Sequence, residues 1–353
     1  MRIVFLAWRD TAHRNAGGSE VVIAELARRL AQRGHEVELY HGGPSSADGY
    51  RSRSAGGTYS QYVAVPVAFH RHADHPDVVV DVSNGVPFWS PWWQRAPVVA
   101  MVHHVHTDQW DTQFAAPFAR LGRWLESSAA PRVYRRSTYL SVSASTSASL
   151  ARLGVDPSRI ETIEMGVGFE PDPPAPDPQP RFVVIARLVP HKRVEVALRC
   201  WAAVRPQLNG GELVVIGDGP ELDRLQKLAG PGVRFTGWID EGQKRREIAA
   251  AWALVHPAHH EGWGVVITEA AIACVPAVGF DVPGVRDAIA DEKTGLLADD
   301  EESFIDQWVR VATDRDLRDR LANAARVRAA TFSWTVAVDR SEALLIDVAM
   351  RSR

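Results

Sequence analysis

Short apolar runs alternate with amphipathic stretches along the first half of the chain. RIVFLAW (2–8) and HEVELY (35–40) have the length and composition of buried strands. Between them, SEVVIAELARRLAQRG spaces its apolar residues at helical intervals, with Ser19 as the predicted N-cap and Gly34 as the stop. The same order continues through PDVVVDV, PVVAMVHH and TYLSVSA, each followed by sequence that can form a helix. Strands that alternate with helices predict parallel βαβ units in a doubly wound α/β sheet.

A proline-rich segment separates two such regions. In EPDPPAPDPQPR, residues 170–181, six of twelve residues are proline, which predicts a semi-rigid extended linker. The alternation then starts again, with the strand candidates FVVIARL, ELVVIGDG, VRFTGW, ALVHPA and PAVGF. We therefore predict an N-terminal domain at residues 1–169 and a C-terminal domain at residues 182–353, both doubly wound. The second domain ends in a helical tail, and we expect that its last helix can cross back to the first domain.

The composition indicates an ordinary globular protein. The 353 residues are 46% hydrophobic and 24% charged, and the formal net charge of −3 gives no reason to expect a nucleic acid partner. No run of about 18 apolar residues indicates a membrane-spanning helix. The two cysteines, Cys200 and Cys274, lie in apolar stretches without metal-ligand spacing, so we expect reduced thiols in a cytoplasmic protein.

Glycine-rich and basic loops follow several predicted strands, where ligands of doubly wound folds bind. AGGSE places Gly17 and Gly18 at the start of a helix, which suits a phosphate or another polar ligand but also a plain capped turn. IARLVPHKR sets Arg187 and Lys192 five residues apart across a turn. A guanidinium and an ammonium in that place suit a diphosphate, although a solvated basic turn has the same composition.

Two further loops carry aromatic and acidic side chains. FTGWID supplies Trp238 and Ile239, which can form a wall for a nucleotide base or pack in the core. EGWGVVITE enters a helix and places Glu261 and Glu269 eight residues apart. Two carboxylates can accept hydrogen bonds from both ends of a nucleotide sugar, while cations and backbone amides bind its phosphates. The alternative is a loop that leads into a helix with two unrelated acids.

The order of these motifs resembles one enzyme family. GGSE, a histidine at a strand end, RLVPHK, GDGP and EGWGVVITEA follow one another as in the retaining glycosyltransferases of family 4. Members of that family typically read GG-x-E, GRL-x-x-x-KG, G-x-GP and EGFG-x-x-x-x-EA. The resemblance covers nearly the whole chain. It implies the GT-B fold, with two doubly wound domains facing across a cleft, and a nucleotide-diphosphate sugar of the GDP-mannose or UDP-glucose type as hexose donor.

The resemblance also implies roles for individual residues. Arg187 and Lys192 match the pair that holds the donor diphosphate and neutralises the leaving group. Glu261 matches the glutamate that contacts donor sugar hydroxyls, and Glu269 matches the one that binds the nucleotide ribose. His103 matches a strand-end histidine near the donor sugar. The predicted donor site also includes Gly17, Gly18, Gly262, Trp263, Gly264, Trp238 and Ile239.

The chain departs from the family pattern at several positions. Ala186 and Arg193 stand where family members commonly have glycine, next to the basic pair. DVPGVRDAI has Pro283 and Asp287 where glycine and glutamate are frequent, and Trp263 replaces a phenylalanine. These differences bear on donor binding more than on the reaction.

We predict a reaction that needs no metal and no cofactor. The one Asp-x-Asp sequence, DRD at 314–316, lies in the helical tail, so the predicted cleft offers no paired carboxylates for a divalent cation. Arg187 and Lys192 can stabilise the leaving diphosphate instead. HHVH has no cysteine or carboxylate close by, which favours hydrogen-bonding histidines over a zinc site. By resemblance the anomeric configuration is retained, through front-face attack in which a donor phosphate oxygen takes the acceptor proton.

The acceptor side is expected in the N-terminal domain. PFWSPWW (87–93) groups three tryptophans, which can stack on sugar rings, meet a membrane interface or pack in a core. Residues 118–136 interleave five arginines with leucine and tryptophan. This segment is either a peripheral contact with anionic lipid at the inner face of the cell membrane or a solvated amphipathic helix. The acceptor class stays open between a sugar, a lipid-linked compound and a small molecule.

Two other functional classes remain open from the sequence. A nucleotide-sugar epimerase of the same architecture would turn over a nucleotide sugar without an acceptor, and the E-x7-E motif counts against it. A non-catalytic sugar-nucleotide-binding protein is expected to have lost the basic pair or the glutamates, and all four residues are present.

Overall fold

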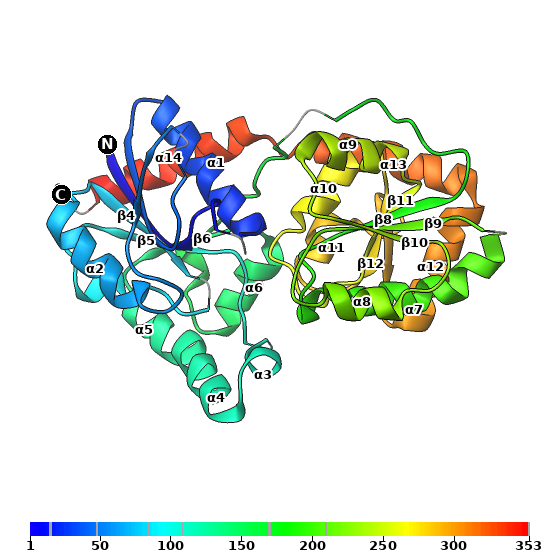
Figure 1. Cartoon of the computed structure of the whole chain (residues 1–353). Coiled ribbons are helices and arrows are strands. Elements are labelled where there is room, and N and C mark those ends of the chain that lie inside the picture. Colours follow the sequence, from blue (N-terminus) through cyan, green and yellow to red (C-terminus); the bar gives the residue numbers. More distant parts are fainter. Residues whose placement is uncertain are drawn as a thin grey trace. The chain divides into compact units, whose positions relative to one another are not determined.

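The computed structural model describes residues 1–13, 16–46, 49–83, 85–107, 109–168, 171–208 and 210–351 (Figure 1). The chain forms two compact units. Unit 1 consists of Met1–Met165 and Trp334–Arg353, and unit 2 consists of Gly166–Ser333. Each unit contains one parallel sheet with helices on both faces, so the predicted doubly wound α/β class is confirmed.

Unit 1 is built on a seven-stranded parallel sheet with the order β3-β2-β1-β4-β5-β6-β7. The strands are β1 (Arg2–Arg9), β2 (Glu36–Gly42), β3 (Arg51–Ser54), β4 (Val78–Ser83), β5 (Val98–Val102), β6 (Thr138–Ser141) and β7 (Ile160–Thr162). The chain moves from β1 to β3 in one direction and from β4 to β7 in the other. The point where the direction changes therefore lies beside the carboxyl end of β1, where the AGGSE loop starts, and ligands of open α/β sheets bind at such points.

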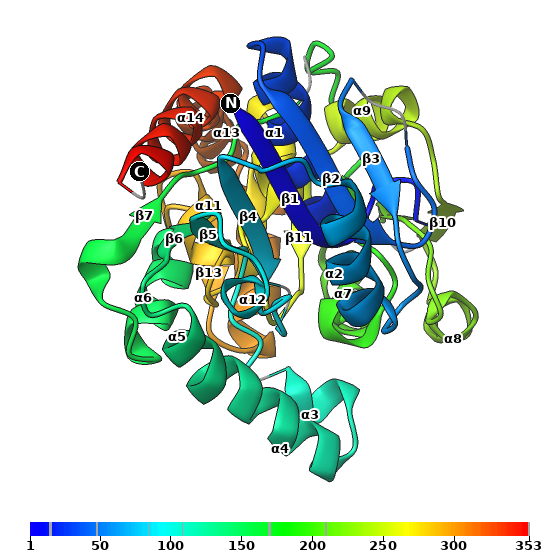
Figure 2. The same ribbon diagram turned by 90° about the vertical axis from the view of Figure 1, so that its left-hand side faces the viewer.

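Helices cover both faces of this sheet (Figures 1 and 2). One face is covered by α1 (Gly18–Gln32) and α14 (Trp334–Met350), which pack against each other and against the central strands. The other face is covered by α2 (Gln61–His72), η1 (Ser90–Trp92), α5 (Ala130–Val133) and α6 (Ala144–Arg152). The connection from β5 to α5 contains α3 (Trp110–Gln113), α4 (Ala116–Trp124) and the π-helical turn η2 (Leu125–Ala129).

Unit 2 is built on a six-stranded parallel sheet with the order β10-β9-β8-β11-β12-β13. The strands are β8 (Arg181–Ile185), β9 (Glu212–Ile216), β10 (Val233–Gly237), β11 (Ala253–His256), β12 (Ala277–Phe280) and β13 (Gly295–Ala298). The direction changes between β8 and β11, which are neighbours in the sheet. Their carboxyl ends carry the RLVPHK and EGWGVVITE loops.

Two hydrophobic clusters lie on the two faces of this sheet. One cluster involves α7 (Val194–Val204), α8 (Leu222–Leu228), α12 (Glu301–Thr313) and the start of α13 (Arg315–Ala329). The other involves α9 (Glu241–Ala250), α10 (Val265–Ile272) and α11 (Val285–Ala288). Across the helices that the structure describes, none combines the length and the apolar character needed to span a bilayer.

The unit boundaries differ from the predicted domain limits. The predicted linker, 170–181, starts at a residue outside the described ones, and its described residues belong to unit 2. The reason is local hydrogen bonding: the backbone N–H groups of Ala175 and Asp177 donate to the carbonyl oxygens of Ala249 and Ala250 at 3.0 and 2.9 Å. The last helix, α14, lies in the range 182–353, was expected to be able to cross back to the first domain, and belongs to unit 1.

Candidate active site

The loop after β8 carries both residues of the basic pair. Arg187 follows the end of β8, and Lys192 closes the short helix η4 (Pro190–Lys192). The next residue, Arg193, has a φ of 51°, in the left-handed region that favours glycine, and it starts α7. Both cationic side chains therefore come from one short connection at the carboxyl end of a central strand.

The GDGP turn supports this loop through close backbone contact. A Cβ atom at Gly217 would lie 1.9 Å from the carbonyl oxygen of Ala186, and one at Gly219 would lie 2.3 Å from that of Leu188. The Leu188 N–H also donates to the carbonyl oxygen of Asp218 at 2.9 Å. Because a side chain at either glycine would displace the loop, this turn helps to fix the position of the basic pair.

Glu261 lies between β11 and α10 and contacts two basic side chains. Lys192 Nζ donates a hydrogen bond to Glu261 Oε1, and His256 Nε2 lies 3.2 Å from the same oxygen. Burial alone would raise the pKa of Glu261, but Lys192 and His256 outweigh burial and hold this pKa well below its ordinary value. Glu261 is therefore an anion at neutral pH, fixed beside one cation of the pair.

Glu269, in the second turn of α10, binds a different lysine. Lys244 Nζ of α9 donates to both Glu269 carboxylate oxygens, at 3.0 and 3.1 Å, and lies 2.9 Å from Glu241. Burial raises the pKa of Glu269, Lys244 opposes this shift without cancelling it, and the charge of Glu241 adds to it. For Lys244, burial lowers the pKa, but the two glutamates outweigh it and the pKa is raised.

In the turn between the two glutamates, the main chain is available to a ligand, whereas the Trp263 ring is buried. Gly264 has a φ of 71° and is the N-cap of α10. The Trp263 side chain is buried, and its ring meets that of Phe332 edge-on with centroids 4.8 Å apart. The indole therefore packs inside unit 2, and a ligand at this turn would meet the main chain from Gly262 to Gly264.

The two residues predicted to border the base have different surroundings. Trp238, directly after β10, is 78% exposed. Ile239 is partly buried against the hydrophobic cluster under α9 and α10. An exposed indole at the carboxyl end of a strand is available for stacking, whereas the side chain of Ile239 contributes to packing.

In unit 1 the glycine loop joins α1 through a different cap from the predicted one. α1 begins at Gly18, and Gly17 is its N-cap. The Gly17 N–H and the Ser19 hydroxyl donate to Glu20 Oε2 at 2.8 and 3.0 Å, and Arg9 Nε lies 3.5 Å from Glu20 Oε1. The prediction of Ser19 as N-cap is wrong, because the Glu20 carboxylate reaches back and engages both groups.

His103 follows β5 and is buried. Burial lowers the pKa of its imidazole to about 4, with a further decrease from His106 and an opposing effect of Glu20. Its carbonyl oxygen accepts a hydrogen bond from Thr146 Oγ1 at 2.9 Å, and its Nε2 has no hydrogen-bond partner among the residues that the structure describes. At neutral pH His103 is a neutral imidazole.

Comparison with known proteins identifies the family. Residues 169–328 match the family described as glycosyl transferases group 1, and residues 16–170 match the one described as Glycosyltransferase Family 4. The chain belongs to the group 1, family 4 glycosyltransferases. The two matches together span most of its length.

Curated relatives of this chain are named as glycosyltransferases. D-inositol 3-phosphate glycosyltransferase of Nocardioides sp. is 26% identical over 406 residues, covering 96% of this chain and 86% of the relative. A GDP-mannose-dependent alpha-(1-6)-phosphatidylinositol monomannoside mannosyltransferase of Mycobacterium tuberculosis is 29% identical over 204 residues, 51% of each chain.

Solved structures share the fold of this glycosyltransferase. Sucrose-phosphate synthase of Thermosynechococcus elongatus superposes with a TM-score of 0.82 at 20% identity, covering 98% of both chains. HepE of Anabaena gives a TM-score of 0.78 at 15% identity, covering 98% of this chain and 100% of its own. The predicted GT-B class is confirmed by these similarities and by the two parallel sheets.

The predicted site residues of this glycosyltransferase divide between the units. Unit 1 carries Gly17, Gly18 and His103, and unit 2 carries Arg187, Lys192, Glu261, Glu269, the turn 262–264, Trp238 and Ile239. Sequence reasoning missed His256 and Lys244. His256 ends the strand before Glu261, so its place at the same sheet edge could have been inferred. Nothing in QKRRE distinguishes Lys244 from the arginines that follow it.

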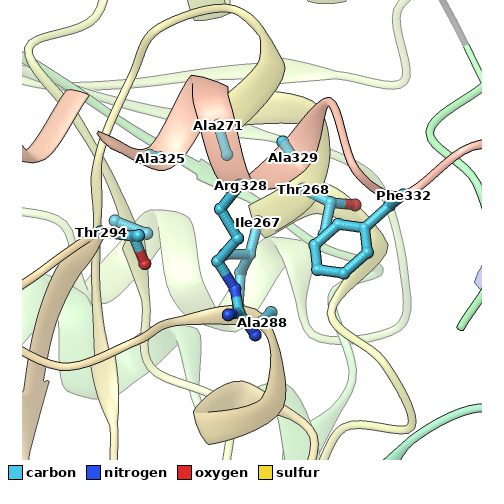
Figure 3. Close-up of a pocket in the computed structure, with 10 residues that line it drawn as sticks. Ile267, Thr268, Ala271, Ala288, Thr294, Ala325, Arg328, Ala329 and Phe332 are labelled. Atoms are coloured by element: carbon cyan, nitrogen blue, oxygen red, sulfur yellow. The ribbon is translucent and has the colours of Figure 1, made fainter. Parts of the chain in front are cut away.

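The DVPGVRD segment, which departs from the family pattern, packs against the backbone of Glu261. A Cβ atom at Gly284 would lie 2.2 Å from the Glu261 carbonyl oxygen, and the Gly284 N–H donates to Asp287 Oδ2 at 3.1 Å. Figure 3 shows Arg328 of α13 reaching from that helix toward α11, in a cavity lined mainly by small side chains. Its guanidinium donates to the Asp287 carbonyl oxygen at 2.8 Å. Asp287 therefore caps α11 as a glutamate could, and Arg328 holds α11 beside the Glu261 loop.

Proposed function

We propose that this glycosyltransferase moves a hexose from a nucleotide-diphosphate sugar to an acceptor hydroxyl, with retention of the anomeric configuration and without a metal ion. The observation that supports this most directly is the hydrogen bond between Lys192 and Glu261. Arg187 lies in the same connection as Lys192. Unit 2 thus has cations for a leaving diphosphate next to an anion for sugar hydroxyls.

The Lys192–Glu261 pair suits two parts of one donor. An ammonium group has three N–H donors, so Lys192 can keep its bond to Glu261 and also bind a phosphate oxygen. An ionised carboxylate only accepts hydrogen bonds, which matches the hydroxyl groups of a hexose. When the bond between the anomeric carbon and the diphosphate breaks, negative charge grows on the diphosphate, and Arg187 and Lys192 stabilise it.

The proposed transfer needs no nucleophile from the protein. The acceptor oxygen bonds to the anomeric carbon on the face from which the diphosphate leaves, and its proton passes to a phosphate oxygen of the leaving group. The protein positions the reactants and stabilises charge. The family resemblance assigns His103 to the donor sugar, and its low pKa suits a neutral hydrogen-bonding role.

The donor is proposed to be of the GDP-mannose or UDP-glucose type. The Mycobacterium tuberculosis relative is named as GDP-mannose-dependent, and the HepE structure was solved with UDP and glucose. Glu269 is the proposed partner of the ribose, and the exposed Trp238 is the proposed platform for the base. The names of the curated relatives specify inositol 3-phosphate and a phosphatidylinositol mannoside, which supports a polyol or sugar hydroxyl as acceptor.

Metal independence is proposed from the basic pair, and the location from the two cysteines. Arg187 and Lys192 can supply the positive charge that a divalent cation supplies in other transferases. We therefore expect turnover to continue in excess EDTA, and loss of turnover that Mn²⁺ restores would contradict this. Cys200 and Cys274 are free, which supports a reducing, cytoplasmic location.

Donor binding provides the first test. Thermal denaturation is measured with UDP- and GDP-sugars in the presence of EDTA, and the preferred donor should raise Tm by linkage. The anomeric configuration of the product is then determined by NMR. No stabilisation by any nucleotide sugar, or a product with inverted configuration, would contradict the proposal.

A further inference from the structure

The two lysine–glutamate pairs of unit 2 differ in geometry. Lys244 Nζ donates to both carboxylate oxygens of Glu269, at 3.0 and 3.1 Å. Lys192 Nζ donates to one oxygen of Glu261, Oε1. Among the residues that the structure describes, none forms a hydrogen bond with the other oxygen, Oε2, which is accessible to solvent. Both oxygens of Glu269 are therefore occupied, whereas Glu261 keeps one oxygen open.

His256 accounts for this difference. Its Nε2 lies 3.2 Å from Glu261 Oε1, the oxygen that also accepts from Lys192. If the carboxylate turned to present both oxygens to Lys192, Oε1 would have to leave its place beside the imidazole. In the described part of the chain no histidine lies within ion-pair distance of Glu269, which meets its lysine through both oxygens. A second basic group on one oxygen thus separates the two pairs.

Strand β11 fixes the direction of the His256 side chain. Side chains alternate between the two faces of a strand. Val255 belongs to the cluster that involves α7 and α12, and Leu254 belongs to the one that involves α9, α10 and α11. His256, two residues after Leu254, therefore faces α10, and its backbone is in register with Gly279 of the neighbouring strand β12. The imidazole is only 3% exposed, so the sheet holds it rigidly in front of the loop that carries Glu261.

Packing alone does not explain a histidine at this position. The three residues before it, Ala253, Leu254 and Val255, are apolar and fully buried. His256 Nε2 is buried as well, and it has no well-aligned hydrogen bond among the described residues. A buried N–H in that state destabilises a fold relative to an apolar side chain. With its proton on Nε2, however, the imidazole directs the positive end of a dipole at the ionised Glu261 carboxylate.

We propose that His256 is a positioning residue of the transfer reaction: it holds Glu261 Oε1 and thereby keeps Oε2 open for a hydroxyl group of the donor hexose. This inference rests on the proposed function, which assigns Glu261 to the sugar. Without His256 the carboxylate can turn onto Lys192, as Glu269 does on Lys244. Oε2 would then be occupied, and the lysine would have fewer N–H groups for the leaving diphosphate.

Kinetics of His256 variants test this role. Turnover of UDP-glucose and GDP-mannose is measured as released nucleoside diphosphate. His256→Leu should lower kcat about tenfold, because the open oxygen binds a group whose charge changes during the reaction. The affinity for UDP and GDP, measured by calorimetry, should change less than about twofold, since neither ligand contains the sugar. His256→Gln supplies an amide N–H near the position of Nε2 and should restore most of the lost kcat.

A double-mutant cycle separates positioning from general damage. In the Glu261→Ala background, His256→Leu should change kcat by less than about twofold, because the carboxylate that it positions is absent. Val255→Ala is the matched control: the side chain is buried on the opposite face of β11, so its truncation should lower Tm through a cavity and leave kcat unchanged. The same loss of kcat in both Glu261 backgrounds, or failure of His256→Gln to restore kcat, would overturn the proposal.

Crystallography tests the positioning independently of turnover. In the crystal structure of His256→Leu without donor, Lys192 Nζ should contact both oxygens of Glu261, as Lys244 contacts Glu269. A contact that still involves Oε1 alone would overturn the role of His256, even in an active enzyme. Absence of turnover of any nucleotide sugar by the parent protein would contradict the proposed function, and the crystal structure would still decide the geometric part.

A second variant covers the case in which the leucine variant does not fold. His256→Asn retains a polar side chain that is too short to reach Oε1 from the strand. It should therefore show the same loss of kcat, the same loss of coupling to Glu261 and the same symmetric contact with Lys192. Parent-like kcat in His256→Asn would overturn the proposal.

Discussion

The two glutamates of EGWGVVITE have similar burial but opposite electrostatic behaviour. Burial pushes the pKa of both upward. At Glu261, Lys192 and His256 outweigh burial and the pKa is lowered. At Glu269, burial outweighs Lys244, the charge of Glu241 adds to the upward shift, and the pKa is raised. Glu261 and Glu269, eight positions apart, therefore differ in pKa, and Glu261 stays ionised to a lower pH than Glu269 does.

This difference suggests that Glu261 and Glu269 have different roles in the proposed donor site. A permanent anion beside the basic pair belongs where charge changes during the reaction, since its interactions differ between ground state and transition state. Glu269, whose pKa is raised, suits a part of the donor whose charge does not change during the reaction. There it would contribute to donor binding but not to catalysis. Five experiments test this comparison.

Removing a cation next to Glu261 should have the largest effect. Arg187→Ala and Lys192→Ala are each expected to lower kcat about 100-fold or more, because one well-placed charge stabilises a developing oxyanion by about 3 kcal/mol. Lys192→Ala should also lower Tm, since it leaves the buried Glu261 carboxylate without its ammonium partner. Steady-state kinetics and thermal denaturation measure both effects.

Arg199→Ala is the control for this experiment. Arg199 is exposed and pairs with Glu301, so its removal should leave kcat unchanged. Near-normal turnover of Arg187→Ala or Lys192→Ala would remove that residue from the mechanism.

The glutamates themselves should fail in different ways. Glu261→Gln is expected to lower kcat roughly 10- to 100-fold, and Glu269→Gln should mainly raise the donor KM by a similar factor, since each loses one charge-assisted interaction. Calorimetry with UDP and GDP should show weaker binding for Glu269→Gln only. Equal loss of nucleoside diphosphate affinity in both variants would show that the two carboxylates do not hold different ends of the donor.

The pH dependence should separate the two carboxylates further. As pH falls toward the raised pKa of Glu269, this carboxylate gains a proton and loses acceptor capacity, so the donor KM should rise. Glu261, whose pKa is lowered, stays ionised over the same range and should not contribute to a fall in kcat.

Lys244→Met removes the group that opposes protonation of Glu269. The rise in KM should therefore begin at a higher pH, with a donor KM roughly severalfold above the parent value near neutrality. Lys244→Arg should restore the parent profile in large part. The same pH profile in Lys244→Met and the parent protein would remove Lys244 from donor binding.

The smallest effect concerns backbone strain next to the basic pair. Arg193 adopts a left-handed conformation, so Arg193→Gly should raise the free energy of unfolding by up to about 1 kcal/mol. The lost contacts of Arg193 with Glu301 and with the Phe280 ring reduce this gain. Arg199→Gly, inside α7, should lower it by about 1 kcal/mol. Urea denaturation measures both. A change in kcat for Arg193→Gly would show that strain at this residue affects Lys192.

Local patterns in the sequence were sufficient for much of the fold. Strands such as RIVFLAW and FVVIARL are apolar because their sheets are covered on both faces, so each can be recognised without reference to the rest of the chain. The parallel arrangement then places the loops after β8 and β11 at one sheet edge, and the structure brings Lys192 and Glu261 into contact there.

Long-range packing could not be read from the sequence. The contact between Lys244 and Glu269 depends on how α9 lies beside α10. Trp263 turns away from its loop because Phe332, far along the chain, provides a partner ring. The proline-rich segment resembles a free linker, yet its N–H groups bind the end of α9. Each of these outcomes is decided by a distant element rather than by the residues of the segment itself.

The assignment of α14 to unit 1 has a consequence for biosynthesis. Unit 2 is one continuous stretch, Gly166–Ser333, and can fold as soon as it leaves the ribosome. Unit 1 cannot complete its fold until α14 has been synthesised, because α14 follows unit 2 in the chain and packs on β4, β5 and α1, where Arg33 binds Asp339 and Glu342. Throughout the synthesis of unit 2, the part of the unit 1 sheet that α14 covers therefore stays exposed, so the first unit to emerge is completed only after the second.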